Sequence, residues 1–142
     1  MIDSERALKI ILRLVGLFCL LALAAAFAPT SLLAWCHEQL GFGEFPATPV
    51  VEYLARSVSL FYAGLGGLLL VTSADVRRAA PVITYLAVAG LVFSIVILFV
   101  DEWVGLPTWW SVGECVSLLP LCVVILWLQV RMTSTVAKEK ER

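Results

Sequence analysis

The sequence predicts an all-α integral membrane protein: a four-helix bundle with both termini in the cytoplasm. Hydrophobic side chains make up 61% of its 142 residues and charged side chains only 15%, far from the composition of a soluble domain. Four apolar runs each have the length of about 20 residues that a helix needs to cross a bilayer core of about 30 Å. These runs nearly exhaust the chain, so we expect a single transmembrane domain over residues 1–142 and no soluble domain.

Each apolar run is expected to form one membrane helix. The expected helices span residues 9–28, 50–72, 81–100 and 109–130, and a solvated tail follows at 131–142. Backbone amides in lipid must be bonded within their own segment, and uninterrupted apolar runs do not match the alternating strands of a barrel. The first run resembles a signal peptide because it ends in small residues, but Pro29 disfavours cleavage after Ala28. We therefore interpret it as the first membrane helix.

The orientation follows from the basic residues, of which nine of the ten gather at three places along the chain and the tenth is Arg56. The nine are Arg6, Lys9 and Arg13 around the start of the first run, Arg77 and Arg78 after the second, and Arg131, Lys138, Lys140 and Arg142 after the fourth. The connections at 29–49 and 101–108 contain no lysine or arginine. By the positive-inside rule both termini are expected to be cytoplasmic, as in a multi-pass protein of the bacterial inner membrane. The basic rim suits anionic lipid headgroups, so membrane lipids are expected partners and nucleic acid is not.

The long connection between the first two helices contains "PTSLLAWCHEQLGFG". Thr30 or Ser31 can cap a short helix that Gly41 ends, and its leucines share one face. We expect this helix to lie flat on the outer membrane surface. The second outer connection, "DEWVGLPTWW", is rich in tryptophan and is expected to form part of an aromatic belt, with a lid over a ligand cavity as the alternative.

An arginine within the second apolar run, in "VEYLARSVSLFYAGLGG", is the main candidate for a functional site. Arg56 lies about 9 Å along the helix from Val50, and Glu52 precedes it by one helical turn. The candidate polar site comprises Glu52, Tyr53, Arg56, Ser57, Tyr62, Asp101 and Glu114. One interpretation is that Arg56 extends to the interface and pairs with Glu52 without any function. The other is a cluster that binds a polar headgroup, relays protons or fastens the helix ends together.

Small residues in the same helix favour close helix packing. Ser59, Ala63 and Gly67 recur every four residues, which lets two backbones approach closely. The face they form is expected to pack within the bundle or to serve as a seam between two copies in a homo-oligomer.

The cysteines and the single histidine indicate little redox or metal chemistry. Cys36 and Cys115 are expected on the same outer side and can form a disulfide between the surface helix and the fourth membrane helix. Cys19 and Cys122 are expected to be small apolar packing residues. The sequence has no CxxC pair, and His37 alone makes neither a metal cluster nor a haem axial pair. No metal, cofactor or catalytic residue is therefore predicted.

The order of these features resembles the DoxX-like group of small four-helix bacterial membrane proteins. The resemblance covers Phe27 to Trp127 and rests on "FAP", "EYLARSVSLFYAGLGGLLL", "ADVRRAAP" and "DEWVGLPTWW". It implies that Arg56 matches the arginine in the second helix of that group. Members of the group are mostly uncharacterised, and some are linked to membrane redox complexes as accessory subunits. The long outer connection and the tryptophans are departures from the group's pattern.

Two functions remain open from the sequence. The first is a non-enzymatic accessory or interaction subunit of a membrane complex, whose partner is another membrane protein or a second copy. The alternative is a protein that binds a small molecule or a lipid headgroup around Arg56, with a redox link. An ion channel is disfavoured because the inner halves of the helices offer no polar path.

Overall fold

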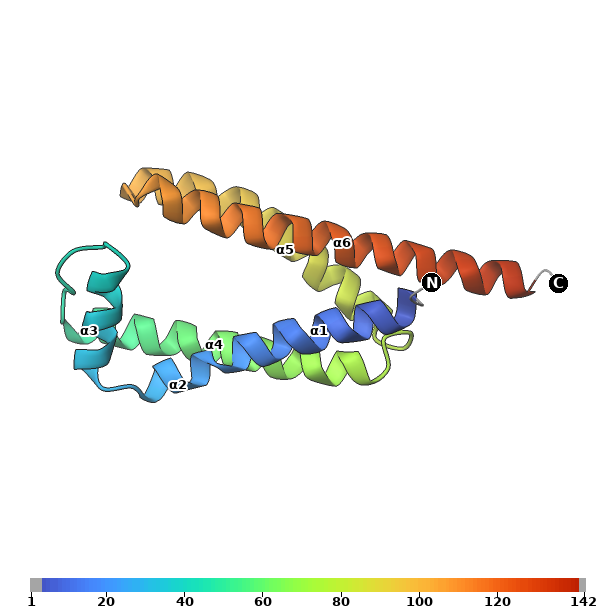
Figure 1. Cartoon of the computed structure of the whole chain (residues 1–142), viewed down its shortest axis with the longest axis horizontal. Helices are drawn as coiled ribbons and strands as arrows, with labels where there is room; N and C mark the ends of the chain where they lie inside the picture. The colour runs from blue at the N-terminus through green and yellow to red at the C-terminus, as the bar shows by residue number, and fades with distance from the viewer. Residues whose placement is uncertain (1–3, 141–142) are drawn as a thin grey trace. The chain divides into compact units, whose positions relative to one another are not determined.

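The computed structural model of the chain describes the backbone of residues 4–140 and the side chains of residues 4–133. The described chain is all-helical, as expected, with its helices joined by short turns and one longer loop (Figure 1). The helices are α1 (Ser4–Leu20), α2 (Ala22–Phe27), α3 (Thr30–Gln39), α4 (Pro49–Ala74), α5 (Ala80–Val104) and α6 (Thr108–Lys140).

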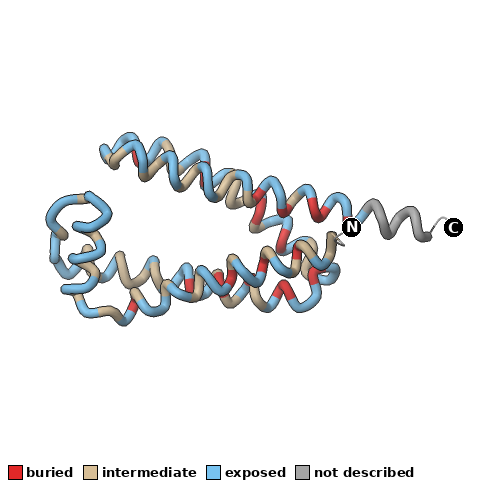
Figure 2. Tube along the Cα trace, in the orientation of Figure 1, coloured by how far each residue is buried: buried red, intermediate tan, exposed pale blue. Residues whose placement is uncertain are grey.

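Four helices are long and apolar enough to cross a membrane, which confirms the expected number. They are Ser4–Phe27, which joins α1 and α2, Pro49–Ala74, Ala80–Val104 and Thr108–Thr133. Only 17% of the apolar window of each is buried inside the molecule. Figure 2 shows the same result as isolated buried positions along helices that are mostly exposed. Most residues of these apolar windows therefore keep exposed or half-exposed surface.

Two helices run further than expected. Asp101 and Glu102 are expected in a connection, but α5 continues to Val104 and includes both. Gly105 ends α5 with a positive φ of 78°, and its N–H and that of Leu106 donate to the Asp101 carbonyl. Likewise, α6 continues to Lys140, so the backbone of residues 131–140 is helical and not an irregular tail.

The helix of the first membrane segment contains a 3₁₀-like turn near its end. Leu21 separates α1 from α2, and its N–H donates to the Phe18 carbonyl three residues back, as in a 3₁₀ turn. Ala28 then adopts an extended backbone with ψ of 147°, because the following Pro29 disfavours the helical conformation. The chain therefore leaves this helix abruptly, with the last carbonyls of α2 in need of donors.

The chain divides into two compact units. The hairpin unit consists of Met1–Leu12 together with Thr72–Arg142, and the clasp unit consists of Arg13–Val71. Each is described separately below.

The clasp unit is organised around a close crossing of two glycines. A Cβ added to Gly66 of α4 would meet the Gly16 carbonyl oxygen at 2.6 Å and the Leu20 amide at 2.9 Å. A Cβ on Gly16 of α1 would likewise meet the Gly66 carbonyl oxygen at 2.9 Å. The two helix backbones can approach this closely only because neither residue has a side chain. The expected four-residue series included Gly67, whereas the crossing uses Gly66.

The hairpin unit is built by α5 and α6, which pack along one seam. Four residues of α5 are buried at spacings of four and seven, namely Ile83, Ala87, Ser94 and Asp101. In α6 the buried residues Cys122, Ile125, Gln129 and Met132 follow a heptad spacing, and Leu128 is buried beside Gln129. Gly90 lies in the seam, since a Cβ there would meet the Cys122 Sγ at 2.6 Å. Near the other end of the pair, the Gln129 side-chain amide donates to the Ala80 carbonyl over 3.2 Å.

Candidate functional site

Arg56 holds the end of α2 and the start of α3 against α4. Its Nη1 donates to the carbonyl oxygens of Ala26 and Ala28, both at 2.9 Å, and its Nη2 donates to the Thr30 hydroxyl at 3.4 Å. The Thr30 hydroxyl donates in turn to the Glu52 carboxylate over 3.0 Å. Glu52 lies 3.7 Å from the Arg56 guanidinium. We call Ala26, Ala28, Thr30, Glu52 and Arg56 the Arg56 clasp.

The local sequence explains why these groups meet. Thr48 caps α4, because its hydroxyl accepts from the Val51 N–H, and Pro49 suits the first helical turn. Glu52 and Arg56 therefore lie in the first two turns of α4, one above the other. In Figure 1, α3 crosses the Pro49 end of α4, which is where Thr30 reaches Glu52. Pro29 has no N–H, so the backbone offers one hydrogen-bond donor fewer at the end of α2. The Arg56 guanidinium supplies donors to the carbonyls there.

The clasp explains how a cation is accommodated in an apolar segment. The Arg56 side chain is about two-thirds buried, and a cation near the C-terminal end of a helix is favoured by the helix dipole. Charge-assisted hydrogen bonds to two carbonyls are stronger than neutral ones. The geometry matches a structural role closely, because the planar fork of arginine reaches two acceptors at once.

The remaining predicted neighbours of Arg56 on α4 are not its partners. Tyr53 is 69% exposed and Tyr62 is 44% exposed, and Ser57 is half-buried. Sequence reasoning found Glu52 by its spacing but missed Ala26, Ala28 and Thr30. The abrupt helix end at "FAP" was the available signal, since carbonyls at a helix end in an apolar segment need donors.

The surface helix exists but is capped differently from our expectation. The N-cap of α3 is Pro29, and the Thr30 hydroxyl serves Glu52 instead of the helix end. Gly41, with φ of 77°, follows the helix as predicted. No residue of α3 is buried, and Trp35 is 58% exposed. His37 packs between Phe42 and Phe45 and its Nδ1 bonds the Gly43 carbonyl over 3.1 Å, so it is part of the loop structure.

Asp101 and Glu114 belong to the hairpin unit, at the end where α5 turns into α6. Asp101 is only 2% exposed, and among the described residues its Oδ2 has no hydrogen-bond partner. Glu114 is half-buried on α6, one turn before Leu118, whose side chain faces Gly90 of α5. The hydrogen bonds of Arg56 all lie within the clasp unit, so the predicted meeting of Arg56 with these two carboxylates stays a prediction.

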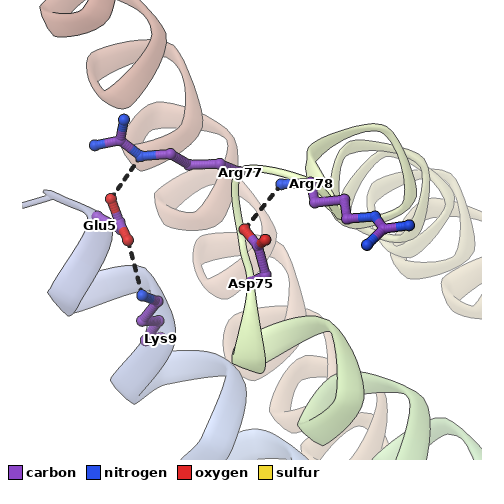
Figure 3. Close-up of polar contacts among 5 residues, drawn as sticks. All are labelled: Glu5, Lys9, Asp75, Arg77 and Arg78. Carbon is purple, nitrogen blue, oxygen red and sulfur yellow. Dashed lines mark hydrogen bonds and ion pairs between the residues drawn. The ribbon is translucent and has the colours of Figure 1, made fainter.

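A second polar cluster lies at the start of α1, within the hairpin unit (Figure 3). Glu5 accepts from Lys9 and from Arg77, both over 2.7 Å, and so links the first turn of α1 to the connection after α4. Asp75 accepts from the Arg78 backbone N–H over 3.1 Å, and the Arg78 guanidinium is directed away from Glu5. The cluster ties two sequence-distant segments together at the basic rim predicted from the sequence.

The four cysteines differ in exposure. Cys36 is exposed and Cys122 is buried, while Cys19 and Cys115 are half-buried. Cys36 and Cys115 belong to different units, so a disulfide between them stays a prediction. Among the residues described, no group of three or more histidine, cysteine or acidic side chains could hold a metal ion.

No family model, curated protein or solved structure matches the chain.

Proposed function

We propose that the chain is a multi-pass protein of the bacterial inner membrane that acts as a non-enzymatic accessory or interaction subunit. In this proposal both termini are cytoplasmic, and the Arg56 clasp and α3 face the opposite side. The partner is another membrane protein or a second copy of the chain. The resemblance to the DoxX-like group is part of the same proposal.

The single observation that carries the proposal is the uncovered apolar surface of four long helices. Only 17% of each apolar window is buried, so most of it must contact lipid or another membrane protein. The small residues Gly64 and Gly67 of α4 have open space beside them, which leaves room for the close approach of another helix. The Arg56 guanidinium serves the fold of its own chain, which favours an architectural role for it.

Insertion and orientation are tested first. The full chain should stay in the membrane pellet after alkaline carbonate extraction. A phosphatase fused within the loop before α4 should be active outside the cytoplasm, and a fluorescent protein fused to the C-terminus should fluoresce. Release of the chain by carbonate would contradict membrane insertion, and the reverse reporter pattern would contradict the orientation.

The role as a subunit is tested by site-specific crosslinking in the native membrane. A photo-crosslinking residue at Gly67 should give one adduct of defined mass, either with a second copy or with a membrane protein. The photo-crosslinking residue placed instead at Gly113 of α6, which also faces open space, is the matched control for nonspecific capture. Turnover of a substrate by the purified chain in lipid would contradict the proposal.

A second candidate function is favoured by the partial exposure of the clasp. The Arg56 side chain is 31% exposed and that of Glu52 is 32% exposed, so an anionic small molecule or lipid headgroup can reach the guanidinium. This alternative predicts that Arg56→Lys weakens ligand binding by more than it weakens folding, since lysine lacks the planar fork. The measurement is retention of anionic lipid by native mass spectrometry beside the thermal midpoint of the same sample. Equal retention by both proteins leaves Arg56 with its structural role only.

A further inference from the structure

A buried carboxylate without a partner lies where α5 meets α6. The α5 positions that face α6 are known from Ala87, Gly90 and Ser94, and Asp101 follows Ser94 by two helical turns on the same face. Its Oδ2 is buried and has no hydrogen-bond partner among the described residues. A buried carboxylate oxygen left without a donor is costly, so a native structure normally supplies one.

The stretch of α5, the turn and α6 around Asp101 has no basic side chain to supply that donor. Between Arg78 and Arg131 the sequence contains no lysine, arginine or histidine. The same stretch carries three carboxylates, at Asp101, Glu102 and Glu114. Asp101 is buried, and half-buried Glu114 lies one turn before Leu118, which approaches Gly90 of α5, whereas Glu102 is exposed. A cation that neutralises Asp101 and bonds its Oδ2 would therefore come from outside these two helices.

We propose that Asp101 and Glu114 bind a primary ammonium group at the α5–α6 turn, and that the ethanolamine headgroup of a membrane lipid supplies it. An ammonium group carries three N–H donors, enough to bond the Asp101 Oδ2 and a second carboxylate together. The trimethylated nitrogen of a choline headgroup has no N–H and cannot satisfy that oxygen. The site is thus selective between two headgroups that carry the same charge.

The aromatic residues at this turn favour a lipid over a soluble amine. Trp103 is 91% exposed, and Trp109 and Trp110 stack edge to face with ring centroids 5.7 Å apart. Indole rings concentrate at headgroup depth in membranes, and their faces attract ammonium groups. The inference rests on the proposed membrane insertion of α5 and α6, but it does not depend on the proposed role as a subunit.

The test uses the full chain in nanodiscs of phosphatidylglycerol mixed with an equal amount of either phosphatidylethanolamine or phosphatidylcholine. Native mass spectrometry then measures which lipids the released protein retains. We expect wild type to prefer the ethanolamine lipid over the choline lipid by about tenfold, the value of one charge-assisted hydrogen bond. Asp101→Asn should abolish the preference and Glu114→Gln should reduce it. Glu102→Gln removes a neighbouring but exposed carboxylate and should leave the preference intact.

Each other outcome overturns the inference. Equal retention of the two lipids by wild type excludes a selective site, and a preference that survives Asp101→Asn places it elsewhere. If Glu102→Gln also loses the preference, the preference comes from the general negative charge of this end of the molecule and not from a site at Asp101. Displacement of the lipid by millimolar free ethanolamine, with the same dependence on Asp101, assigns the site to a soluble amine. The thermal midpoint of each variant shows whether it is folded. If Asp101→Asn does not fold, the test relies on Glu114→Gln.

Insertion is scored separately in the same membranes. A chain that resists carbonate extraction but shows no headgroup preference contradicts only this inference. A chain that carbonate releases contradicts the proposed function itself.

Discussion

At the scale of single residues, Arg56 joins several polar groups of the clasp unit. It bonds two helix-end carbonyls and the Thr30 hydroxyl, so its loss leaves several acceptors without donors. We expect Arg56→Met to lower the free energy of unfolding by about 2–4 kcal/mol. The measurement is SDS titration in mixed micelles, followed by tryptophan fluorescence.

The matched control for Arg56 is Arg78, whose exposed guanidinium is directed away from the Glu5 cluster. Arg78→Met should change the free energy of unfolding by less than about 0.5 kcal/mol. If both variants lower the free energy of unfolding by the same amount, Arg56 acts only as a general surface charge and the hydrogen bonds of the clasp do not stabilise the fold.

Thr30 provides an independent measure of the clasp. Thr30→Val keeps the shape of the side chain but removes the hydroxyl that accepts from Arg56 and donates to Glu52. We expect a loss of about 1–2 kcal/mol in the same SDS titration, whereas Ser31→Ala on the exposed side of α3 should be close to neutral. An effect of Ser31→Ala as large as that of Thr30→Val would point to helix capping, the role that the sequence had suggested for either residue.

At the scale of elements, the two glycine contacts decide how closely neighbouring helices pack. Gly66→Ala would place a Cβ at 2.6 Å from the Gly16 carbonyl oxygen, a backbone atom that cannot rotate away. We expect α1 and α4 to separate and the free energy of unfolding to fall by about 2 kcal/mol or more. Gly67→Ala, the neighbouring control, meets open space and should be neutral or stabilising by up to about 1 kcal/mol, since alanine is the better helix former. The reverse order of the two effects would show that Gly66 does not lie in the crossing.

The seam between α5 and α6 allows a double-mutant cycle. Gly90→Ala alone would collide with the Cys122 Sγ at 2.6 Å, so we expect a loss of about 1–3 kcal/mol. Adding Cys122→Ala removes that sulfur and should restore part of the stability. The coupling energy from unfolding of the four proteins measures the contact, and additive effects would exclude a direct contact between these positions.

At the scale of the whole molecule, the orientation of the chain can be read from its cysteines. Cys36 is exposed, whereas Cys122 is 4% exposed. We expect a membrane-impermeant maleimide to label Cys36 in intact spheroplasts and to leave Cys122 unlabelled until the protein is unfolded. Labelling is measured as a mass shift, with Cys36→Ser as the control.

The same labelling tests the disulfide that the sequence suggested. Labelling of Cys36 that needs prior reduction and disappears in Cys115→Ser would establish a bond to Cys115. No labelling of Cys36 in intact spheroplasts, with full labelling after lysis, would place α3 on the cytoplasmic side.

The sequence by itself determined the helical class and the four membrane-length segments. These are local properties, because segment length and apolar composition decide whether a helix can cross a bilayer. The pairing of Glu52 with Arg56 was also accessible, since a spacing of four residues brings side chains together on any helix. Pro29 and Gly41 marked the ends of α2 and α3 for the same local reason.

Only the tertiary structure decided what these residues contact. Two partners of Arg56 are backbone carbonyls about 30 positions earlier in the chain, and backbone acceptors leave no mark in a pattern of side chains. The burial of Asp101 depends on α5 continuing past it and turning back through Gly105 against α6. The choice of Gly66 over Gly67 depends on the rotation of α4 about its axis. Contacts between distant segments depend on how the helices pack, and many packings satisfy the same apolar pattern.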